Sequence, residues 1–298
     1  MSTAPAEPPP VGTGEDRYFE DFAVGQRFTS GPRVVTAADL AEFTRLSGDD
    51  HPLHTDPGYR SGPGRPVLQG PFGLAVAMGL LQRLGLVGDA VVGLLDSHWY
   101  YRRPVHVGDV LRLEMTVVRC RRSRRGDRGV VTRHMRLVND RGADGQGAVV
   151  QEGTTAVLLA ARGAGPDPVA RDFGTVAWGE ALAARLGPGT AFAEALASWD
   201  GTIGLRAGDH EVHLRVYRGA VIEVSGRSAL GATFTLEADE LTWTDLIGGE
   251  TNDFVRRTMA GQFAVRGNAY EYLRLTRPLH AVIDAARALA ADEEGAAA

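Results

Sequence analysis

The sequence contains no lysine: all 32 of its basic residues are arginine. Without lysine, the chain has no group for Schiff-base chemistry, no anchor for pyridoxal phosphate and no Walker lysine. It has one cysteine, Cys120, so an internal disulfide is impossible and CxxC redox or zinc-ribbon motifs are excluded. We expect Cys120 to be a packed thiol, and a reducing, cytoplasmic location fits this composition.

Long apolar runs are also missing. The longest near-continuous one, residues 76–81 with their flanks, is interrupted by glycine and falls far short of the ~20 residues that span a bilayer. Residues 1–17 have neither an apolar core nor an early basic run, so we expect no targeting signal. The formal net charge of −5 argues against a general nucleic-acid partner. We expect no metal ion and no cofactor.

The length of 298 residues suggests two domains, at about 100–150 residues each. Residues 1–17 are rich in proline and are predicted to be a disordered tail. Residues 162–176 are dominated by Gly, Pro and Asp and interrupt the strand-like alternation, which is typical of a linker. These breaks predict domains at 18–161 and 177–290, followed by a frayed tail at 291–298.

The first domain has the pattern of helices followed by a long antiparallel meander. A β-rich run at 28–35 precedes a helix over 36–47, with Asp39 placed for a capping box. After a polar loop at 48–56, residues 71–84 form a helix that is apolar on almost every face and should be buried all round. Four strand-like runs follow, as in successive hairpins: 91–102, 110–121, 130–139 and 147–161. We therefore expect a sheet wrapped around a helix.

The second domain has strands first and helices mostly after them. A helix is predicted at 178–186 and a late strand at 262–266. The other predicted strands are 201–205, 211–217, 220–225 and 233–237, and the other helices are 239–247, 252–259, 270–275 and 279–290. Both halves of the chain are thus α+β.

The segment FTRLSGDDHPLH, residues 43–54, carries the sharpest chemical signal. It combines a helix end, a glycine, the carboxylate of Asp49 and, five residues later, the imidazole of His54. Pro52 stiffens the intervening loop. A rigid turn can aim a carboxylate and an imidazole at one point, as a two-group acid/base site requires.

This segment closely resembles the S-G-D-x-N-P-L-H motif of the MaoC-like (R)-specific enoyl-CoA hydratases. Three further stretches resemble the same family in the same order: YFEDFAVGQ at 18–26, GRPVLQG at 64–70 and RPVHVGD at 103–109. The resemblance covers about residues 18–161. It implies a hotdog fold, in which an antiparallel sheet wraps a central helix, and a homodimer or paired-hotdog unit.

The resemblance also implies roles for the matching residues. Asp49 and His54 would hold and activate a water molecule, and the backbone N–H of Gly70 would polarise a thioester carbonyl. Ser47, Asp50 and His51 would surround this pair. Two departures are visible, because His51 replaces the asparagine of the motif and Gln69 stands where the family usually has histidine. Helix N-termini suit the proposed role of Gly70, since their free N–H groups stabilise a developing enolate oxygen.

The implied activity is reversible hydration or dehydration of a trans-2-enoyl thioester, with coenzyme A or acyl carrier protein as the handle. Two alternatives stay open: Michael-type cyclisation or dehydration of a polyketide-like intermediate at the same site, and a non-catalytic acyl or lipid carrier. The arginine-rich hairpin, including Arg121, Arg122 and Arg124, is a candidate site for the phosphates of the handle, because guanidinium groups suit phosphate. A solvated turn is the other interpretation.

The second half resembles the sterol carrier protein type 2 family from about residue 177 to 290. The carrying features are the Trp199-Asp-Gly-Thr entry, the segment 238–246 and the late GQFAVRGN strand at 261–268. The resemblance implies a lipid or acyl-thioester tunnel, and several apolar residues are candidates to line it or to form plain core: Leu241, Trp243, Leu246, Phe254, Met259 and Phe263. We expect a binding or interaction domain with no acid/base set of its own.

Overall fold

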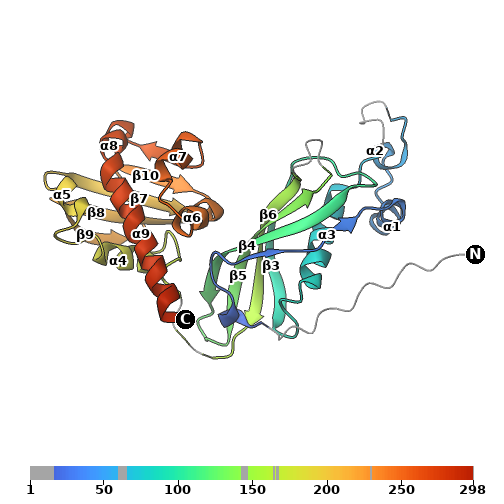
Figure 1. Cartoon of the computed structure of the whole chain (residues 1–298), viewed down its shortest axis with the longest axis horizontal. Helices are drawn as coiled ribbons and strands as arrows, with labels where there is room; N and C mark the ends of the chain where they lie inside the picture. Colours follow the sequence, from blue (N-terminus) through green and yellow to red (C-terminus); the bar gives the residue numbers. More distant parts are fainter. Residues whose placement is uncertain are drawn as a thin grey trace, which may run out of the picture. The chain divides into compact units, whose positions relative to one another are not determined.

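The structure is a computed structural model that describes residues 17–59, 66–141, 147–163, 165, 168–228 and 230–297 (Figure 1). Most of the expected tail at 1–17 therefore lies outside the described residues. The chain divides into two compact units. Unit 1 comprises Met1–Val117 and Arg122–Gly165, and unit 2 comprises Val118–Arg121 and Pro166–Ala298. Each unit has its own sheet.

The sheet of unit 1 has the strand order β1-β4-β5-β6-β3, and β2 pairs with β4. The strands are β1 Arg27–Thr29, β2 Arg33–Val34, β3 Val91–Tyr101, β4 Val110–Arg122, β5 Arg128–Asn139 and β6 Ala148–Ala160. The long β4, β5 and β6 form consecutive antiparallel hairpins, as expected, and the turn between β4 and β5 contains Gly126 and Asp127. Alternate residues along these strands point to one inward face, which carries Gln151, Arg133 and Thr155.

Helix α3, Gly70–Arg83, lies across the inward face of this sheet (Figure 1). Its buried side consists of Phe72, Gly73, Val76, Ala77, Leu80 and Leu81. Opposite it, Leu111, Leu113, Val131 and Leu137 are completely buried. The expected sheet wrapped around a helix, the hotdog arrangement, is confirmed. Three shorter elements precede α3: η1 Phe19–Asp21, α1 Ala37–Ser47 and α2 Pro52–Thr55.

Three details of unit 1 differ from the expectation. Strand β3 does not form a hairpin with β4 but pairs with β6 at the edge of the sheet. Helix α3 is not buried all round, because Pro71, Ala75 and Gly79 are exposed. The polar loop at 48–56 contains the short helix α2, where Pro52 occupies the first turn and its missing N–H costs nothing.

Unit 2 has a five-stranded sheet in the order β11-β10-β7-β8-β9, with β10 parallel to β7. The strands are β7 Asp200–Ala207, β8 His210–Tyr217, β9 Ala220–Ser225, β10 Phe234–Ala238 and β11 Ala264–Gly267. The helices are α4 Val176–Ala184, α5 Ala191–Ala195, α6 Glu240–Ile247, α7 Phe254–Met259, α8 Ala269–Arg274 and α9 Thr276–Ala297. Helix α9 packs against the other five helices, so it organises the helical layer.

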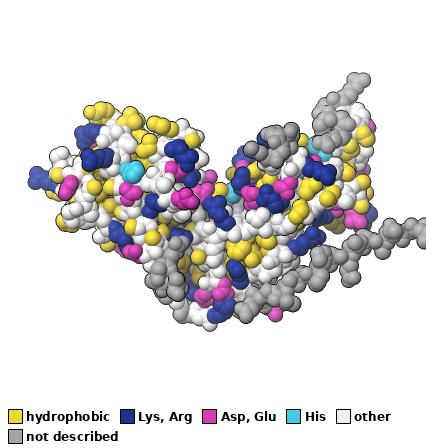
Figure 2. Space-filling model, in the orientation of Figure 1, with side chains coloured by type: hydrophobic (Ala, Val, Ile, Leu, Met, Phe, Trp, Pro, Cys, Tyr) yellow, Lys and Arg dark blue, Asp and Glu magenta, His cyan; other side chains and the backbone are white. Residues whose placement is uncertain are grey.

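Helix α5 was not predicted, and α9 extends through Ala297, so the expected tail at 291–298 is helical over its described residues. Cys120 is buried, and burial raises its pKa to about 12, which confirms the packed thiol. In the part of the chain that is described, no helix is long and apolar enough to cross a membrane. Charged and hydrophobic side chains are interspersed over the visible surface of each unit (Figure 2).

Candidate functional site

The loop that carries Asp49 begins where helix α1 ends. Thr36 and Asp39 form the predicted capping box at the start of α1, and Gly48 ends the helix in the left-handed conformation, with φ of 73°. Glycine adopts this conformation without the steric cost that other residues have. The Asp49 N–H then donates to the Ser47 hydroxyl at 3.2 Å, which holds the first residue of the loop against the helix end.

Helix α2 places His54 beside Asp49. The Nδ1 atom of His54 lies 2.5 Å from the carbonyl oxygen of Val67. Because a carbonyl oxygen can only accept, Nδ1 carries the proton and Nε2 of the neutral ring presents a lone pair. That Nε2 lies 3.5 Å from Oδ2 of Asp49. The sequence-predicted pair is therefore brought together, with the two acceptor atoms facing each other.

Two facing acceptors can bind the same water molecule, because water has two hydrogens to donate. The His54 side chain is enclosed, with 11% of its surface exposed, whereas the Asp49 side chain is 48% exposed. The pair is thus anchored on one side and open to solvent on the other. An imidazole and a carboxylate in this arrangement can accept a proton from water and return one to a neighbouring atom.

Gly70, the first residue of α3, lies on the same pocket as His54. The pocket has a volume of about 300 Å³. Its walls are Leu53, His54, Val67, Leu68, Gly70, Tyr101, Arg102, Arg103, Pro104, Val105 and Gln151. Among the described residues, nothing accepts a hydrogen bond from the Gly70 N–H. A free N–H at the positive end of a helix can stabilise negative charge on an oxygen in the pocket.

Gln151 of strand β6 holds the start of α3 and was missed by the sequence analysis. Its Nε2 donates to the Gly70 carbonyl at 3.1 Å, and its Oε1 accepts from Nε1 of Trp99 at 2.8 Å. Gly73 is needed at this point, because a Cβ there would lie 2.3 Å from the Gln151 amide oxygen. A polar residue at an inward position of a strand is the signal that could have revealed it.

Gln69 ties the Asp49 loop to α1. Its Nε2 donates to the hydroxyl of Thr44 at 2.9 Å and to the backbone carbonyl of Asp49 at 2.8 Å. The side chain is buried, and its Oε1 has no hydrogen-bond partner among the described residues. The residue that replaces the family histidine therefore braces the Asp49 loop through both of its amide hydrogens.

The three neighbouring residues expected around the pair have local structural contacts. Ser47 donates to the Phe43 carbonyl at 2.7 Å while accepting from Asp49. The ring of His51 caps α2, because its Nδ1 accepts from the Leu53 N–H at 3.1 Å. Asp50 is exposed, and its backbone carbonyl accepts from the Thr55 hydroxyl. Within the described chain, no group of three His, Cys, Asp or Glu residues is arranged for a metal ion.

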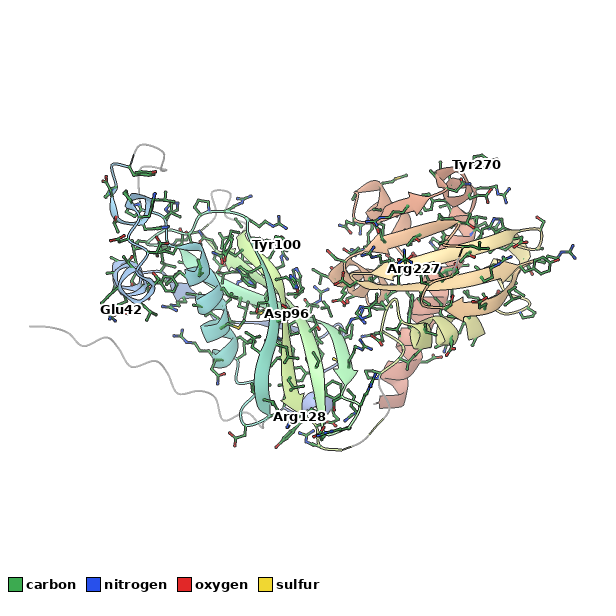
Figure 3. The ribbon with its side chains drawn as sticks, turned by 180° about the vertical axis from the view of Figure 1, so that it is seen from behind. Glu42, Asp96, Tyr100, Arg128, Arg227 and Tyr270 are labelled. Carbon is green, nitrogen blue, oxygen red and sulfur yellow. The ribbon has the colours of Figure 1, made fainter. Side chains whose placement is uncertain are left out.

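The arginine-rich hairpin lies far from this site within one chain. Strand β6 runs from Gln151, at the pocket, to Ala160, which is paired with Arg128 beside the hairpin. Nine residues of strand correspond to about 30 Å. Figure 3 shows Tyr100 and Arg128 at opposite ends of the sheet. The sequence predicted that the Asp49–His54 site and the arginine-rich hairpin belong to one domain. The strand register shows that they lie at opposite ends of its sheet.

The three hairpin arginines also differ from one another. Arg122 donates to Oε1 of Glu20 at 2.9 Å and lies over the ring of Phe19. Burial raises the pKa of Glu20, but hydrogen bonds from the Arg162 N–H and the Arg122 guanidinium outweigh it, so the pKa is lowered overall. Arg121 and Arg124 are exposed. Arg122 is thus engaged inside unit 1, and Arg121 and Arg124 remain accessible for a phosphate.

In unit 2, most of the residues proposed to line a tunnel pack against one another. Trp243 and Phe254 both contact the ring of Phe263, at centroid distances of 5.2 and 5.6 Å. Leu246 is completely buried, whereas Met259 is 85% exposed. These contacts are those of an aromatic core, the second of the two interpretations offered by the sequence.

Comparison with known proteins places the site in a family context. The family of MaoC like domains matches residues 21–138. The (R)-specific enoyl-CoA hydratase of Aeromonas caviae is 32% identical over 127 residues, which cover 42% of this chain and 89% of that protein. The mesaconyl-CoA hydratase of Cereibacter sphaeroides is 28% identical over 136 residues, which cover 44% of this chain and only 38% of that protein.

Two solved structures are similar to parts of the chain. The (R)-hydratase from A. caviae, involved in PHA biosynthesis, has 27% identity and a TM-score of 0.38, with 47% of this chain and 98% of that chain covered. Sterol carrier protein 2 has 22% identity and a TM-score of 0.34, with 38% of this chain and 95% of that chain covered. The MaoC-like family that the sequence resembles is thus found again in the family match and among the sequence relatives.

Proposed function

The chain belongs to the MaoC-like hydratase family, and from this membership we propose that it catalyses the reversible hydration of a trans-2-enoyl thioester to a 3-hydroxyacyl thioester. One observation carries the proposal. His54 Nε2 and Asp49 Oδ2 face each other as acceptors 3.5 Å apart, and His54 shares its pocket with Gly70, whose N–H donates to no described residue. The first feature suits a water molecule, and the second suits a thioester oxygen.

The proposed reaction follows from these groups. The water oxygen bonds to C3 while the Asp49–His54 pair accepts a water proton. Electron density moves to the thioester oxygen, where the Gly70 N–H and the α3 dipole stabilise the enolate. A proton delivered to C2 completes the addition, so that one water molecule is added overall. The two proton transfers belong to the pair as a coupled unit, and the same steps in reverse describe dehydration.

Residues at the mouth of the pocket support a charged handle on the substrate. Arg103 lines the pocket, and its guanidinium makes no hydrogen bond or ion pair with another described residue. Arg102 also lines the pocket but is paired with Glu152 at 2.8 Å. Coenzyme A and the phosphopantetheine of an acyl carrier protein both carry phosphate, which guanidinium groups bind. We therefore propose one of these as the handle.

The edge of the unit 1 sheet supports a homodimer. Strand β3 is 11 residues long and has no partner on its outer side among the described residues. Its exposed apolar side chains include Val91, Val92, Leu94, Leu95, Tyr100 and Tyr101. A long, apolar edge strand is normally covered, and a second copy related by a two-fold axis can cover it through the same residues. We propose that this dimer is cytoplasmic, because a chain with one cysteine cannot form an internal disulfide and fits a reducing compartment.

The decisive experiment is incubation of the full chain with a panel of trans-2-enoyl thioesters, followed by mass spectrometry. Hydration adds the mass of one water molecule, and the reverse reaction removes it from a 3-hydroxyacyl thioester. A product of unchanged mass but different retention would favour Michael-type cyclisation instead. Binding of thioesters without any product would favour the non-catalytic carrier. His51 and Asp50, which lie beside Asp49 in the motif, keep cyclisation open as the alternative at this site.

A further inference from the structure

Strand β5 of unit 1 carries an arginine at a position that faces the core. Along this strand the residues alternate between inward and outward, and the inward set includes Val131, Met135 and Leu137, all completely buried. Arg133 occupies the inward position between Val131 and Met135 and is only 5% exposed. Arginine is almost never this buried unless a partner neutralises it.

Arg133 has no such partner among the described residues. Its Nε donates to the Thr155 hydroxyl at 3.2 Å, and no carboxylate of a described residue lies within ion-pair distance. The terminal nitrogens make no hydrogen bond, although they are not fully enclosed. Burial lowers the pKa of Arg133 to about 10, with no neighbouring charge to offset it. The group is still a cation at neutral pH, so the folded unit contains a largely buried positive charge that no described carboxylate neutralises.

The sheet register connects Arg133 to the candidate active site. Arg133 pairs with Thr155 of β6, and Thr155 pairs with Ser97 of β3, so these three side chains form one polar row on the inward face. Gln151, which holds Gly70, lies on the same face four residues earlier in β6. Four residues of strand correspond to about 13 Å.

Between the row of Arg133, Thr155 and Ser97 and the row that contains Gln151 lies one apolar row. It consists of Met135, Gly153 and Trp99. Gly153 has no room for a side chain, because a Cβ would lie 2.8 Å from the Trp99 ring, which therefore covers it. Away from Gly70, the inward face therefore carries first an amide, then an aromatic ring and a thioether, and then a guanidinium with the hydroxyl groups of Thr155 and Ser97. The Thr155 hydroxyl donates to the sulfur of the buried Met135 at 3.3 Å. This order of groups matches an alkyl chain that ends in an anion.

We propose that Arg133, together with Thr155 and Ser97, binds a carboxylate at the far end of the substrate's acyl chain. This inference rests on the proposed function, because it assigns the acyl group of the enoyl thioester. A carboxylate would supply the missing counter-ion and accept hydrogen bonds from the free guanidinium N–H groups. An extended chain advances about 1.2 Å per bond, so acyl chains of about six to ten carbons suit the separation.

The test compares pairs of trans-2-enoyl-CoA substrates of equal length, one ending in a carboxylate and one in a methyl group. We expect the wild-type chain to prefer the carboxylate by at least about tenfold in kcat/KM, the size of one charge-assisted hydrogen bond. Arg133→Leu should remove this preference while sparing the methyl-terminated substrates. Arg133→Lys should restore part of it. Arg136→Leu is the matched control, because Arg136 is exposed on the outward face of the same strand.

A second measurement does not depend on catalysis. Saturated acyl-CoA analogues with and without the terminal carboxylate are compared by the rise in Tm that they produce. The carboxylate should raise the Tm more in the wild type and equally in Arg133→Leu. If no enoyl thioester is turned over but this difference is seen, the proposed hydration fails and the carboxylate site stands.

Three outcomes would overturn the assignment. A wild-type preference for the methyl-terminated substrate, or the same preference in Arg133→Leu as in the wild type, would exclude a carboxylate at this site. A loss of free coenzyme A affinity in Arg133→Leu would mean that the guanidinium binds a phosphate of the handle. Dissociation of a dimer in this variant, without a change in substrate preference, would mean that its counter-ion belongs to a second copy of the chain.

Discussion

A single hydrogen bond determines how His54 can act. The Val67 carbonyl keeps the proton on Nδ1, so the lone pair of Nε2 faces Asp49. Neither the spacing of Asp49 and His54 in the sequence nor the proline between them specifies this tautomer. It depends on Val67, which is thirteen positions away in the chain. The residue-level chemistry of the pair is therefore set by a contact outside the motif.

Removal of either member of the pair should abolish most of the turnover. We expect Asp49→Asn and His54→Ala each to lower kcat by about 10²- to 10⁴-fold, because each removes a proton acceptor. The fold and thioester binding should be retained, as judged by circular dichroism and calorimetric titration. Glu42→Gln, an exposed change on α1 (Figure 3), is the control and should leave kcat unchanged. Near-wild-type rates in both site variants would refute the acid/base role.

Gln69 should act by positioning Asp49. Gln69→Leu removes the donors to Thr44 and to the Asp49 carbonyl, so the loop gains freedom. We expect kcat to fall by about tenfold or more with little change in KM, since a misplaced acid/base group affects the transition state more than binding. Gln69→His, which keeps one donor, should recover part of the rate.

The matched control for this prediction is Gln82→Leu, because Gln82 is exposed near the other end of α3. Steady-state kinetics and urea denaturation of all three variants separate a positioning effect from a loss of stability. If Gln69→Leu merely unfolds at lower urea concentration while keeping its kcat, Gln69 supports the fold only.

At the scale of elements, the β4–β5 hairpin combines two kinds of arginine. Arg122 is enclosed by Glu20, the Gly126 carbonyl and the ring of Phe19, which ties η1 to the end of β4. Arg124 has no such contacts among the described residues and is exposed. The same residue type therefore stabilises the sheet at one position and remains free for an anionic partner at another.

Arg122→Ala should lower the free energy of unfolding by about 1–3 kcal/mol, because it removes an enclosed guanidinium together with its contacts to Glu20, the Gly126 carbonyl and the Phe19 ring. Arg124→Ala should change it by less than about 0.5 kcal/mol. The pKa of Glu20 is lowered in the fold, so its contribution is present above the unfolded value and is lost as the pH falls through the folded pKa. The cost of Arg122→Ala should therefore shrink below about pH 4, as urea denaturation at two pH values can measure.

The exposed arginines have a separate readout. Charge reversal of Arg121 and Arg124 should raise KM for carrier-protein-bound substrates, because like charges then repel the acidic carrier surface. The KM for short thioesters without a carrier should stay the same. An unchanged KM for both substrate types would mean that the hairpin is a solvated turn. Arg122 is left out of this variant because its reversal would also reduce the stability of the fold, as described above.

For the whole molecule, each unit has the composition of an independent core. Unit 1 buries Leu111, Leu113 and Met115 beneath α3, and unit 2 buries Trp178 and Trp243. Domains with their own cores can in general fold alone. The groups proposed for catalysis all belong to unit 1.

A fragment of residues 1–165 should therefore be expressed in folded form and turn over enoyl thioesters at a rate comparable with the full chain. Analytical ultracentrifugation should find it as a dimer, since the exposed β3 edge belongs to this fragment. The control is the same fragment with Leu94→Lys on that edge, which should shift it toward a monomer. A folded but inactive dimer would move part of the chemistry into unit 2.

The sequence by itself determined the local features of this protein. The capping box of α1, the start of α3, the long strands and the approach of Asp49 to His54 follow from short-range patterns, because each depends on residues within about a dozen positions. The extension of α9 through Ala297 departs from the pattern only at the chain end, where the alanine-rich composition favours helix.

Only the tertiary structure decided which distant residues meet. It placed β3 beside β6 and brought Gln151 to the Gly70 carbonyl. It also directed both amide hydrogens of Gln69 to Thr44 and Asp49, and it buried Arg133 away from every described carboxylate. These contacts depend on strand order and register. The sequence does not specify them, because the alternation of apolar and polar residues in one strand is compatible with more than one neighbouring strand. For this reason the Asp49–His54 pair was visible in the sequence, whereas the residues that hold it in place and the candidate acyl site were not.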